Sequence, residues 1–259
     1  MNPHAAAVVS LHNVGKTFES GTVALDGFSI AVRDGEFVSL LGPSGCGKST
    51  ALRIIAGLSA ASEGTVAWQD TAGDRRGQIG FVFQEPTLMP WATVASNVRL
   101  PLKLAHIGKA QAHAAVAQAL VRVGLAEFAR SYPRELSGGM KMRASIARAL
   151  VTEPELLLMD EPFAALDEIT RFKLNNDLLT LWQELRRTVI FVTHSVFESV
   201  YLSQRIVVMT PRPGRVFAEI AIPAAYPRDE RFRTSAEYAG FCREVAEALA
   251  GAMAAGDVA

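Results

Sequence analysis

The chain has 259 residues, of which 49% are hydrophobic and 20% are charged, a composition typical of a globular protein rather than a disordered one. The 26 basic and 26 acidic residues give a formal net charge of zero, which excludes the basic footprint of a nucleic-acid-binding protein. Two cysteines, Cys46 and Cys242, exclude a disulfide framework and favour a reducing compartment.

The first stretch of the chain, residues 8–36, has short β patterns separated by the turn-forming Gly15, Gly21 and Gly27. This pattern predicts an antiparallel sheet packed beside the main one. The region between about 85 and 145 is predicted to be mostly helical and to form its own lobe.

Three continuous apolar runs predict the strands of a parallel sheet: 36–42 (EFVSLLG), 155–161 (ELLLMDE) and 188–194 (TVIFVTH). Apolar residues at helical spacing predict helices between them, over 47–58, 109–125 and 167–187. This alternation indicates an α/β fold with a mainly parallel sheet flanked by helices. Because ligands gather at the carboxyl ends of such strands, we expect the three strand ends to form one site.

The end of the chain, residues 223–259, is predicted to form a loop, a helix and a frayed tail rich in alanine and glycine. No internal repeat or low-complexity linker interrupts the sequence. We therefore predict a main domain over 1–222 and a short C-terminal extension over 223–259.

A phosphate-binding loop follows the first apolar run. The segment GPSGCGKST matches the pattern G-x-x-x-x-G-K-[ST], between a predicted strand and a predicted helix. Its glycines allow backbone N–H groups to point at phosphate oxygens, its lysine adds a charge, and Ser49 can ligate Mg²⁺. The motif predicts binding of a nucleoside triphosphate by nine residues: Gly42, Pro43, Ser44, Gly45, Cys46, Gly47, Lys48, Ser49 and Thr50.

Two adjacent carboxylates end the second apolar run. Asp160 is placed to hold Mg²⁺, and Glu161 can polarise a water that attacks the γ-phosphate. A cation between them offsets their mutual repulsion, so both can stay ionised. The alternative is an acidic turn at the end of a strand.

Two further polar side chains follow apolar runs. His194 ends the third run, where it can hydrogen-bond the γ-phosphate and orient Glu161 or the water. Gln84 follows the run IGFVF, and its amide can reach Mg²⁺ or the water. A structural histidine and a turn glutamine are the alternatives.

A second potential anion site occurs in LSGGMKMRASIARAL, where Ser137, Gly138 and Gly139 open a predicted helix. Six motifs occur in a specific order along the chain: the phosphate loop, Gln84, LSGG, the Asp-Glu pair, a downstream ALD and His194. From about residue 8 to 220 the chain resembles the ATP-binding subunits of ABC transporters, which are P-loop ATPases with an antiparallel β lobe and a helical lobe.

The resemblance implies ATP and Mg²⁺ as cofactors and a head-to-tail homodimer. Ser137, Gly138 and Gly139 would then contact the γ-phosphate of the ATP held by the partner's Lys48, and Asp167 of ALD would cross the interface. Phe18 in KTF matches the aromatic residue that stacks on adenine, with a core phenylalanine as the alternative.

Several segments are similar to importer ATPases of the nitrate, sulfonate and taurine type, a group that includes importers of pyrimidine-type vitamin precursors. They are LMPWATVASNV, MDEPFAALDEITR, VTHSVFESVYLS, PRPGRV and YPRDERFRTSAEY. Such ATPases work with a separate membrane permease and an extracytoplasmic solute-binding protein. No apolar run here approaches the roughly 18 to 20 residues of a membrane span, so a peripheral location on the cytoplasmic face of the cell membrane is expected. The sequence does not identify which of these solutes is imported.

Two details extend the resemblance. A helix of the permease would dock near EPTLMPWATVASNV, with Met89 and Trp91 as wall residues unless Trp91 is a core aromatic. The chain departs from its relatives at Met142, which occupies a helix position where they commonly have a polar residue.

Other ATPases with these motifs fit less well. A DNA-repair ATPase inserts a coiled coil or zinc modules between the glutamine loop and the signature, but only about 50 residues lie between Gln84 and Ser137. A translation-type ATPase would carry two cassettes in one chain. A phosphoryl-transfer kinase would have no use for the signature helix.

Overall fold

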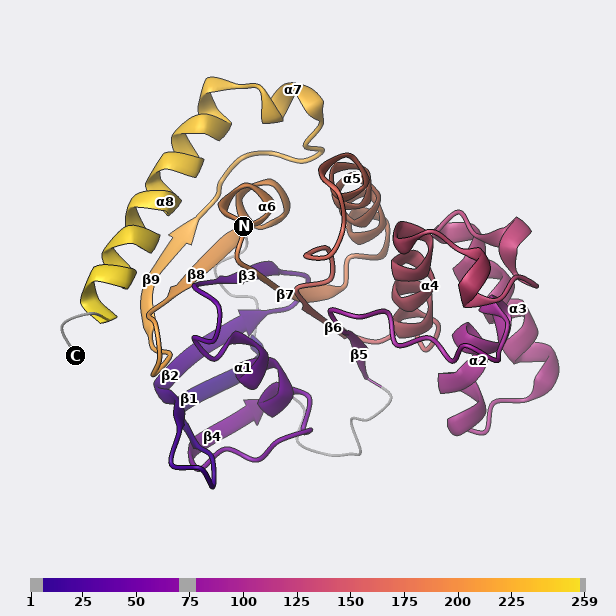
Figure 1. The fold of residues 1–259 in the computed structure, drawn as a ribbon, viewed down its shortest axis with the longest axis horizontal. Coiled ribbons are helices and arrows are strands. Elements are labelled where there is room, and N and C mark those ends of the chain that lie inside the picture. Colours follow the sequence, from indigo (N-terminus) through magenta and orange to yellow (C-terminus); the bar gives the residue numbers. More distant parts are fainter. Residues whose placement is uncertain (1–6, 70–77, 257–259) are drawn as a thin grey trace. The chain divides into compact units, whose positions relative to one another are not determined.

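The computed structural model describes residues 7–69 and 78–256. It divides into two units, one of residues 1–73 and 186–259 and the other of residues 74–185. Figure 1 labels the helices and strands of both units. None of the helices within the described residues has both the length and the apolar character needed to cross a bilayer.

The first unit contains a three-stranded antiparallel sheet in the order β2-β1-β4. Its strands are β1 (Ala7–Thr17), β2 (Val23–Arg33) and β4 (Glu63–Trp68). In the second half of β2, Phe28, Ile30 and Val32 are buried between more exposed residues, as expected for a sheet with one covered face. The antiparallel sheet predicted from the opening segment is confirmed.

A second sheet of this unit has the strand order β7-β3-β8-β9. The strands are β3 (Phe37–Leu41), β7 (Thr188–Thr193), β8 (Arg205–Met209) and β9 (Val216–Ala221). β3 pairs in parallel with both β7 and β8, whereas β9 is antiparallel to β8. All residues of β3 and β7 are buried, which explains their continuous apolar sequence. Helix α1 (Lys48–Ile55) follows β3, and α6 (Val196–Leu202) follows β7.

The C-terminal extension adds two helices to the first unit, α7 (Glu230–Arg233) and α8 (Ala236–Gly256). The prediction of a frayed tail was wrong up to Gly256, because α8 contacts α6, β8 and β9 along its length and buries Val245 and Ala252 completely (Figure 1). Residues 257–259 of the predicted extension lie outside the described residues. The domain boundary after residue 222 stays a prediction.

The second unit combines a short parallel strand pair with helices. β5 (Ile79–Val82) pairs with β6 (Leu156–Asp160). The helices are α2 (Val94–Leu104), α3 (Lys109–Arg122), the 3-10 turns η2 (Ala126–Phe128) and η3 (Pro133–Glu135), α4 (Gly138–Leu150) and α5 (Glu168–Leu185).

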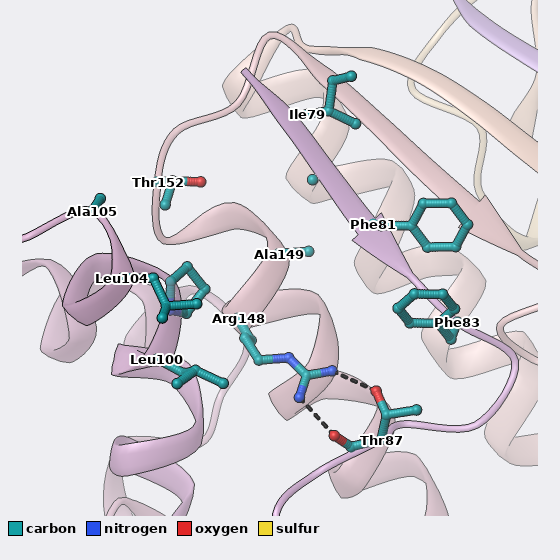
Figure 2. Close-up of a pocket in the computed structure, with 12 residues that line it drawn as sticks. Ile79, Phe81, Phe83, Thr87, Leu100, Leu104, Ala105, Arg148, Ala149 and Thr152 are labelled. Atoms are coloured by element: carbon teal, nitrogen blue, oxygen red, sulfur yellow. Dashed lines mark hydrogen bonds between the residues drawn. The ribbon is translucent and has the colours of Figure 1, made fainter. Parts of the chain in front are cut away.

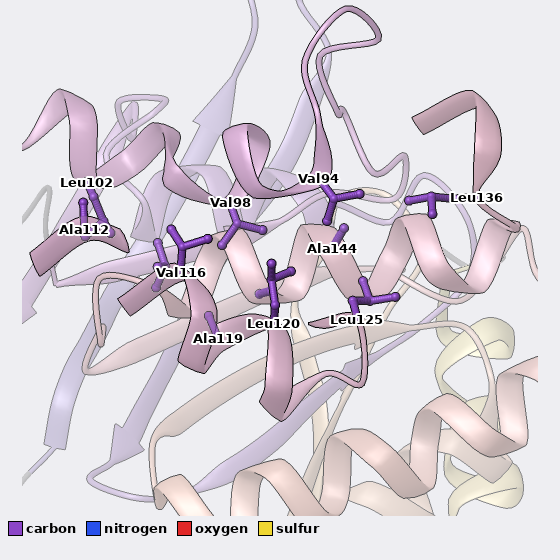
Figure 3. Packing of buried hydrophobic residues seen from close by; sticks show 12 residues of the cluster. Val94, Val98, Leu102, Ala112, Val116, Ala119, Leu120, Leu125, Leu136 and Ala144 are labelled. Carbon is purple, nitrogen blue, oxygen red and sulfur yellow. The ribbon is translucent and has the colours of Figure 1, made fainter. Parts of the chain in front are cut away.

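An apolar cluster holds α2, α3 and α4 together. It includes Val94 and Val98 of α2, Leu120 of α3 and Ala144 of α4, all almost fully buried (Figure 3). The small Ala144 lets α2 approach α4 closely. The α/β fold with a mainly helical middle region follows the prediction.

Candidate functional site

The phosphate loop leads from β3 into α1 in the first unit. Gly45 and Gly47 have φ angles of 78° and 107°, a region that favours glycine. A Cβ atom on Gly47 would lie 2.6 Å from the carbonyl oxygen of Ala24 in β2. The loop can therefore curl against β2 only with glycine at this position.

The loop encloses the side chain of its own lysine. Lys48 begins α1 and is 3% exposed. Its ammonium group donates to the carbonyl oxygens of Gly42 at 2.8 Å and Pro43 at 2.9 Å. A helix amino end, glycine N–H groups and a positioned cation together fit a phosphate chain. Ser49, the next residue of α1, offers the hydroxyl that a phosphate-bound Mg²⁺ would need.

The turn between β8 and β9 packs directly against the phosphate loop, a role that the sequence did not predict. Gly214 donates its N–H to the carbonyl oxygen of Ala24 at 2.9 Å, and the Arg212 Nε donates to that of Gly45 at 3.2 Å. A Cβ atom on Gly214 would lie 2.1 Å from the carbonyl oxygen of Cys46. The segment PRPGRV indicated only a subgroup of relatives, and nothing in its pattern pointed to the loop at 42–50.

We expect Gly214→Ala to lower nucleotide affinity by at least about tenfold and the free energy of unfolding by about 1–3 kcal/mol, because the new methyl group overlaps backbone that has little room to move. Titration with a fluorescent ATP analogue and thermal unfolding measure the two effects. The matched control is Gly240→Ala on α8, where a Cβ atom would meet nothing within 4 Å. Wild-type affinity in Gly214→Ala would contradict this account of the loop.

His194 is exposed between β7 and α6, and the residues on both sides of it are anchored. The Thr193 hydroxyl donates to the Glu198 carboxylate at 2.6 Å and accepts the Ser195 N–H at 3.0 Å. The Ser195 side chain accepts the N–H of Glu198 and so caps the amino end of α6. These contacts fix the backbone that carries the imidazole.

Phe18 lies after β1 and is 42% exposed, so it is not a core phenylalanine. The Lys16 ammonium lies 5.4 Å from the centroid of its ring. A cation near one face and an accessible ring surface make Phe18 suitable for stacking on a base.

In the second unit, Gln84 is exposed at the start of a loop after β5. Arg148 of α4 anchors the following residues by donating to the carbonyl oxygens of Pro86 at 2.9 Å and Thr87 at 2.8 Å. Burial lowers the pKa of Arg148 from its ordinary value. The glutamine loop is thereby tied to the helix that the signature opens.

Asn97 of α2 anchors the rest of this loop. Its side chain is fully buried and accepts the N–H of Met89 at 2.7 Å. Its amide group donates to the carbonyl oxygens of Met89, Ala92 and Thr93 at 3.1–3.2 Å. Trp91, held between these contacts, is 77% exposed and is therefore not a core aromatic. Arg148 and Asn97 lie in segments that the sequence analysis used, but their roles were missed because the pattern does not show which backbone groups their side chains meet.

The two carboxylates lie at the end of β6. Asp160 is its last residue and is 8% exposed, and Glu161 follows with a φ of 45°. This left-handed conformation is costly for a residue with a side chain and is common at functional sites. It directs the chain sharply away from the strand at the predicted base.

The signature serine caps α4. The Ser137 side chain accepts the N–H of Met140 at 3.3 Å, and Gly138 and Gly139 form the first turn with N–H groups that have no partner within the helix. A Cβ atom on Gly139 would lie 2.8 Å from the side chain of Thr170 in α5. Met142 is 2% exposed, so an apolar side chain suits the position at which this chain departs from its relatives.

Asp167 lies directly before α5. Its carboxylate accepts the N–H of Thr170 at 2.9 Å, and this hydrogen bond lowers the pKa of Asp167. The carboxylate is exposed and ionised at neutral pH, which suits a contact with another chain.

A pocket of about 820 Å³ lies beside the glutamine loop within the second unit (Figure 2). Phe83 and Thr87 line it on either side of Gln84, Arg148 and Thr152 line it after the signature, and Leu104 ends α2 at its rim. Met89 and Trp91 are not among the lining residues drawn. A molecule in this pocket would contact the glutamine loop and α4 together.

The predicted site residues divide between the two units. The phosphate loop, Phe18 and His194 belong to the first unit. The others belong to the second unit: Gln84, Ser137, Gly138, Gly139, Asp160, Glu161 and Asp167.

Comparisons with known proteins agree with these features. The family model described as ABC transporter matches residues 25–164. The taurine import ATP-binding protein TauB of Rhizobium johnstonii is 46% identical over 196 residues, which cover 75% of each chain. The aliphatic sulfonates import ATP-binding protein SsuB of Bacillus cereus is 43% identical over 229 residues, covering 86% of this chain and 89% of its own length.

A solved structure is similar as well. The dimeric ATP-binding cassette MJ0796, bound to ADP and Pi in a post-hydrolysis state, matches with a TM-score of 0.72 and 35% identity, over 84% of this chain and 100% of its own. This similarity confirms the predicted fold class. By its sequence and its fold, the chain belongs to the ABC transporter family and is an ATP-hydrolysing ATP-binding protein of that family.

Proposed function

We propose that this chain powers the import of taurine or another small sulfonate through a separate membrane permease, from the cytoplasmic face of the membrane. The observation that carries most weight is the phosphate loop, whose curl depends on Gly47 and whose lysine is already positioned. The names of TauB and SsuB, which describe import of taurine and aliphatic sulfonates, support the class of solute. Nitrate and pyrimidine-type precursors are the competing solutes to be tested.

The proposed hydrolysis assigns a role to each of the predicted site residues. The phosphate loop binds the phosphate chain, and Phe18 stacks on the adenine. Ser49, Gln84 and Asp160 would hold Mg²⁺, which would supply charge neutralisation at the phosphates. Glu161 takes the proton of the attacking water, and His194 orients this water by hydrogen bonding.

The proposed active form is a head-to-tail homodimer. Ser137, Gly138 and Gly139 present their N–H groups and hydroxyl to the γ-phosphate held on the partner. The exposed carboxylate of Asp167 then contacts the second chain. The dimeric state of the similar cassette MJ0796 supports this arrangement.

The pocket beside Gln84 is the proposed docking site for a cytoplasmic helix of the permease. Residues of the glutamine loop and of the helix that the signature opens both line it, so a docked permease helix would contact both elements. The exposed Trp91 extends the apolar surface presented by this loop.

We expect Leu104→Glu to weaken co-purification with the permease by about thirtyfold, because a carboxylate at the pocket rim would lose water without gaining a partner. Leu104 is 71% exposed, so the change should fold. Leu58→Glu, at a position 62% exposed in the first unit, is the control. Equal co-purification of both variants would place the docking site elsewhere.

The transport assignment is tested in vesicles that contain this chain, the cognate permease and the solute-binding protein. ATP hydrolysis is measured with taurine, an alkanesulfonate, nitrate or a pyrimidine precursor outside. Stimulation by taurine or the alkanesulfonate is expected. Stimulation by nitrate or the precursor alone would correct the solute class, and no stimulation together with no permease association would overturn the importer assignment.

A further inference from the structure

The C-terminal extension reaches back to the helix that follows His194. Helix α6 has only seven residues, and the carbonyl groups of its last turn lack partners within the helix. α8 of the extension contacts α6 directly in the first unit (Figure 1). Several α6 carbonyl groups accept hydrogen bonds from side chains of this extension.

Arg228 lies at the carboxyl end of α6 and is 4% exposed. Its guanidinium group donates five hydrogen bonds to backbone carbonyl oxygens: Nη1 to Val200 (2.8 Å), Tyr201 (3.0 Å) and Ser203 (2.9 Å), and Nη2 to Ile222 (3.2 Å) and Ala224 (3.1 Å). A buried cation at this end complements the helix dipole. Its removal would leave these carbonyl oxygens without their donor in a site that water does not reach.

Two tyrosines of the extension complete the contact. The Tyr226 hydroxyl donates to the carbonyl oxygen of Leu202 at 2.9 Å, and the Tyr238 hydroxyl donates to that of Phe197 at 3.0 Å. Burial raises the pKa of both phenols, so the hydroxyl groups keep the protons that they donate. The Arg228 guanidinium also lies 4.2 Å from the centroid of the Tyr226 ring.

The opposite end of α6 is joined to the residues around His194. Glu198 accepts from the Thr193 hydroxyl and gives its N–H to Ser195, as described above. The strand end that carries the histidine thus holds the amino end of this short helix. The extension holds its carboxyl end through Arg228 and Tyr226, and it also contacts Phe197 near the amino end through Tyr238. Because a seven-residue helix depends on tertiary contacts for its stability, loss of the contacts at its carboxyl end should also loosen the backbone that follows His194.

We propose that Arg228 is a positioning residue for His194. It fixes α6 by the carboxyl end, and α6 in turn fixes the backbone on which the imidazole stands. Arg228 itself contacts no nucleotide in this scheme. Through α6, the C-terminal extension therefore contributes to ATP hydrolysis. This inference rests on the proposed role of His194 in hydrolysis.

The test begins with Arg228→Met in the full-length chain. The kcat for ATP hydrolysis should fall about tenfold, while KM for ATP stays within about twofold because the phosphate loop is untouched. Arg228→Lys should recover part of kcat, since an ammonium group can serve up to three carbonyl oxygens. Arg231→Met, an exposed arginine of the same extension, is the matched control. Hydrogen exchange should rise at residues 196–203 in Arg228→Met and stay unchanged at residues 48–55.

A double-mutant cycle separates positioning from general stability. His194→Ala should lower kcat, and Arg228→Met should add no further loss in that background. The same loss in both backgrounds would overturn the inference. If His194→Ala is slow while Arg228→Met is normal, only this inference fails. If His194→Ala hydrolyses ATP at the wild-type rate, both the proposed role of His194 and this inference fail.

A milder variant covers the case in which Arg228→Met does not fold. Tyr238→Phe removes a single hydrogen bond to α6 and keeps the ring. It should lower kcat by about twofold, again only when His194 is present. An unchanged kcat in this variant, with Arg228→Lys also unchanged, would overturn the proposal.

Discussion

Glu161→Gln is expected to reduce steady ATP hydrolysis by at least about 100-fold while ATP binding persists. Glutamine has the size of glutamate and can occupy the same left-handed backbone position, at a φ of 45°, but its amide cannot take a proton from water. Because ATP then stays intact, dimers should accumulate. Phosphate release, ATP titration and light scattering measure the three effects.

The control for this variant is Glu168→Gln, which removes an exposed carboxylate in the first turn of α5. It should hydrolyse ATP at the wild-type rate, because the side chain is at the surface and has no proposed role. Full hydrolysis in Glu161→Gln would remove this residue as the general base. Loss of ATP binding would show instead that the carboxylate holds the nucleotide.

Mixed dimers that combine Lys48→Met with Ser137→Arg should keep one working site when the two changes are on different protomers, and none when both are on the same protomer. In a head-to-tail dimer each ATP contacts Lys48 of one chain and Ser137 of the other. Changes on different protomers can therefore fall in the same site and spare the second. An arginine at the exposed Ser137 also removes the cap of α4 and covers its free N–H groups.

Two affinity tags isolate each mixed dimer, and the amount of trapped ATP per dimer is measured in a Glu161→Gln background. The reverse pattern, with a working site only when both changes share a protomer, would show that each signature serves its own phosphate loop. Dimers with Leu58→Arg in place of Ser137→Arg are the control, because this position is exposed and lies outside the proposed site.

The strands of the parallel sheet were predictable because their sequences carry a local signal. β3, β6 and β7 are buried at every residue, and each appears in the sequence as an unbroken apolar run. The end of the chain lacked such a signal. Alanine and glycine near Gly256 are compatible with a loose tail, and only contacts with distant strands make them helical.

The residues of the candidate site also differ in whether the sequence alone could identify them. Lys48 and Ser137 were predictable because each belongs to a motif in which neighbours along the chain do the chemistry together. Arg148, Gly214 and Arg228 act on backbone groups that are far from them in sequence or belong to no motif. Their roles depend on which segments meet in space, and a single sequence does not contain that information.

In the loop after Gln84, the backbone path and the outward side chains depend on different residues, because Asn97 fixes the path. One buried amide sets the path of residues 89–93 through four hydrogen bonds, while the indole of Trp91 faces outward and contributes nothing to that path. Under the proposed docking of a permease beside this loop, replacement of the outward side chains should alter the choice of permease while Asn97 keeps the path of the loop unchanged.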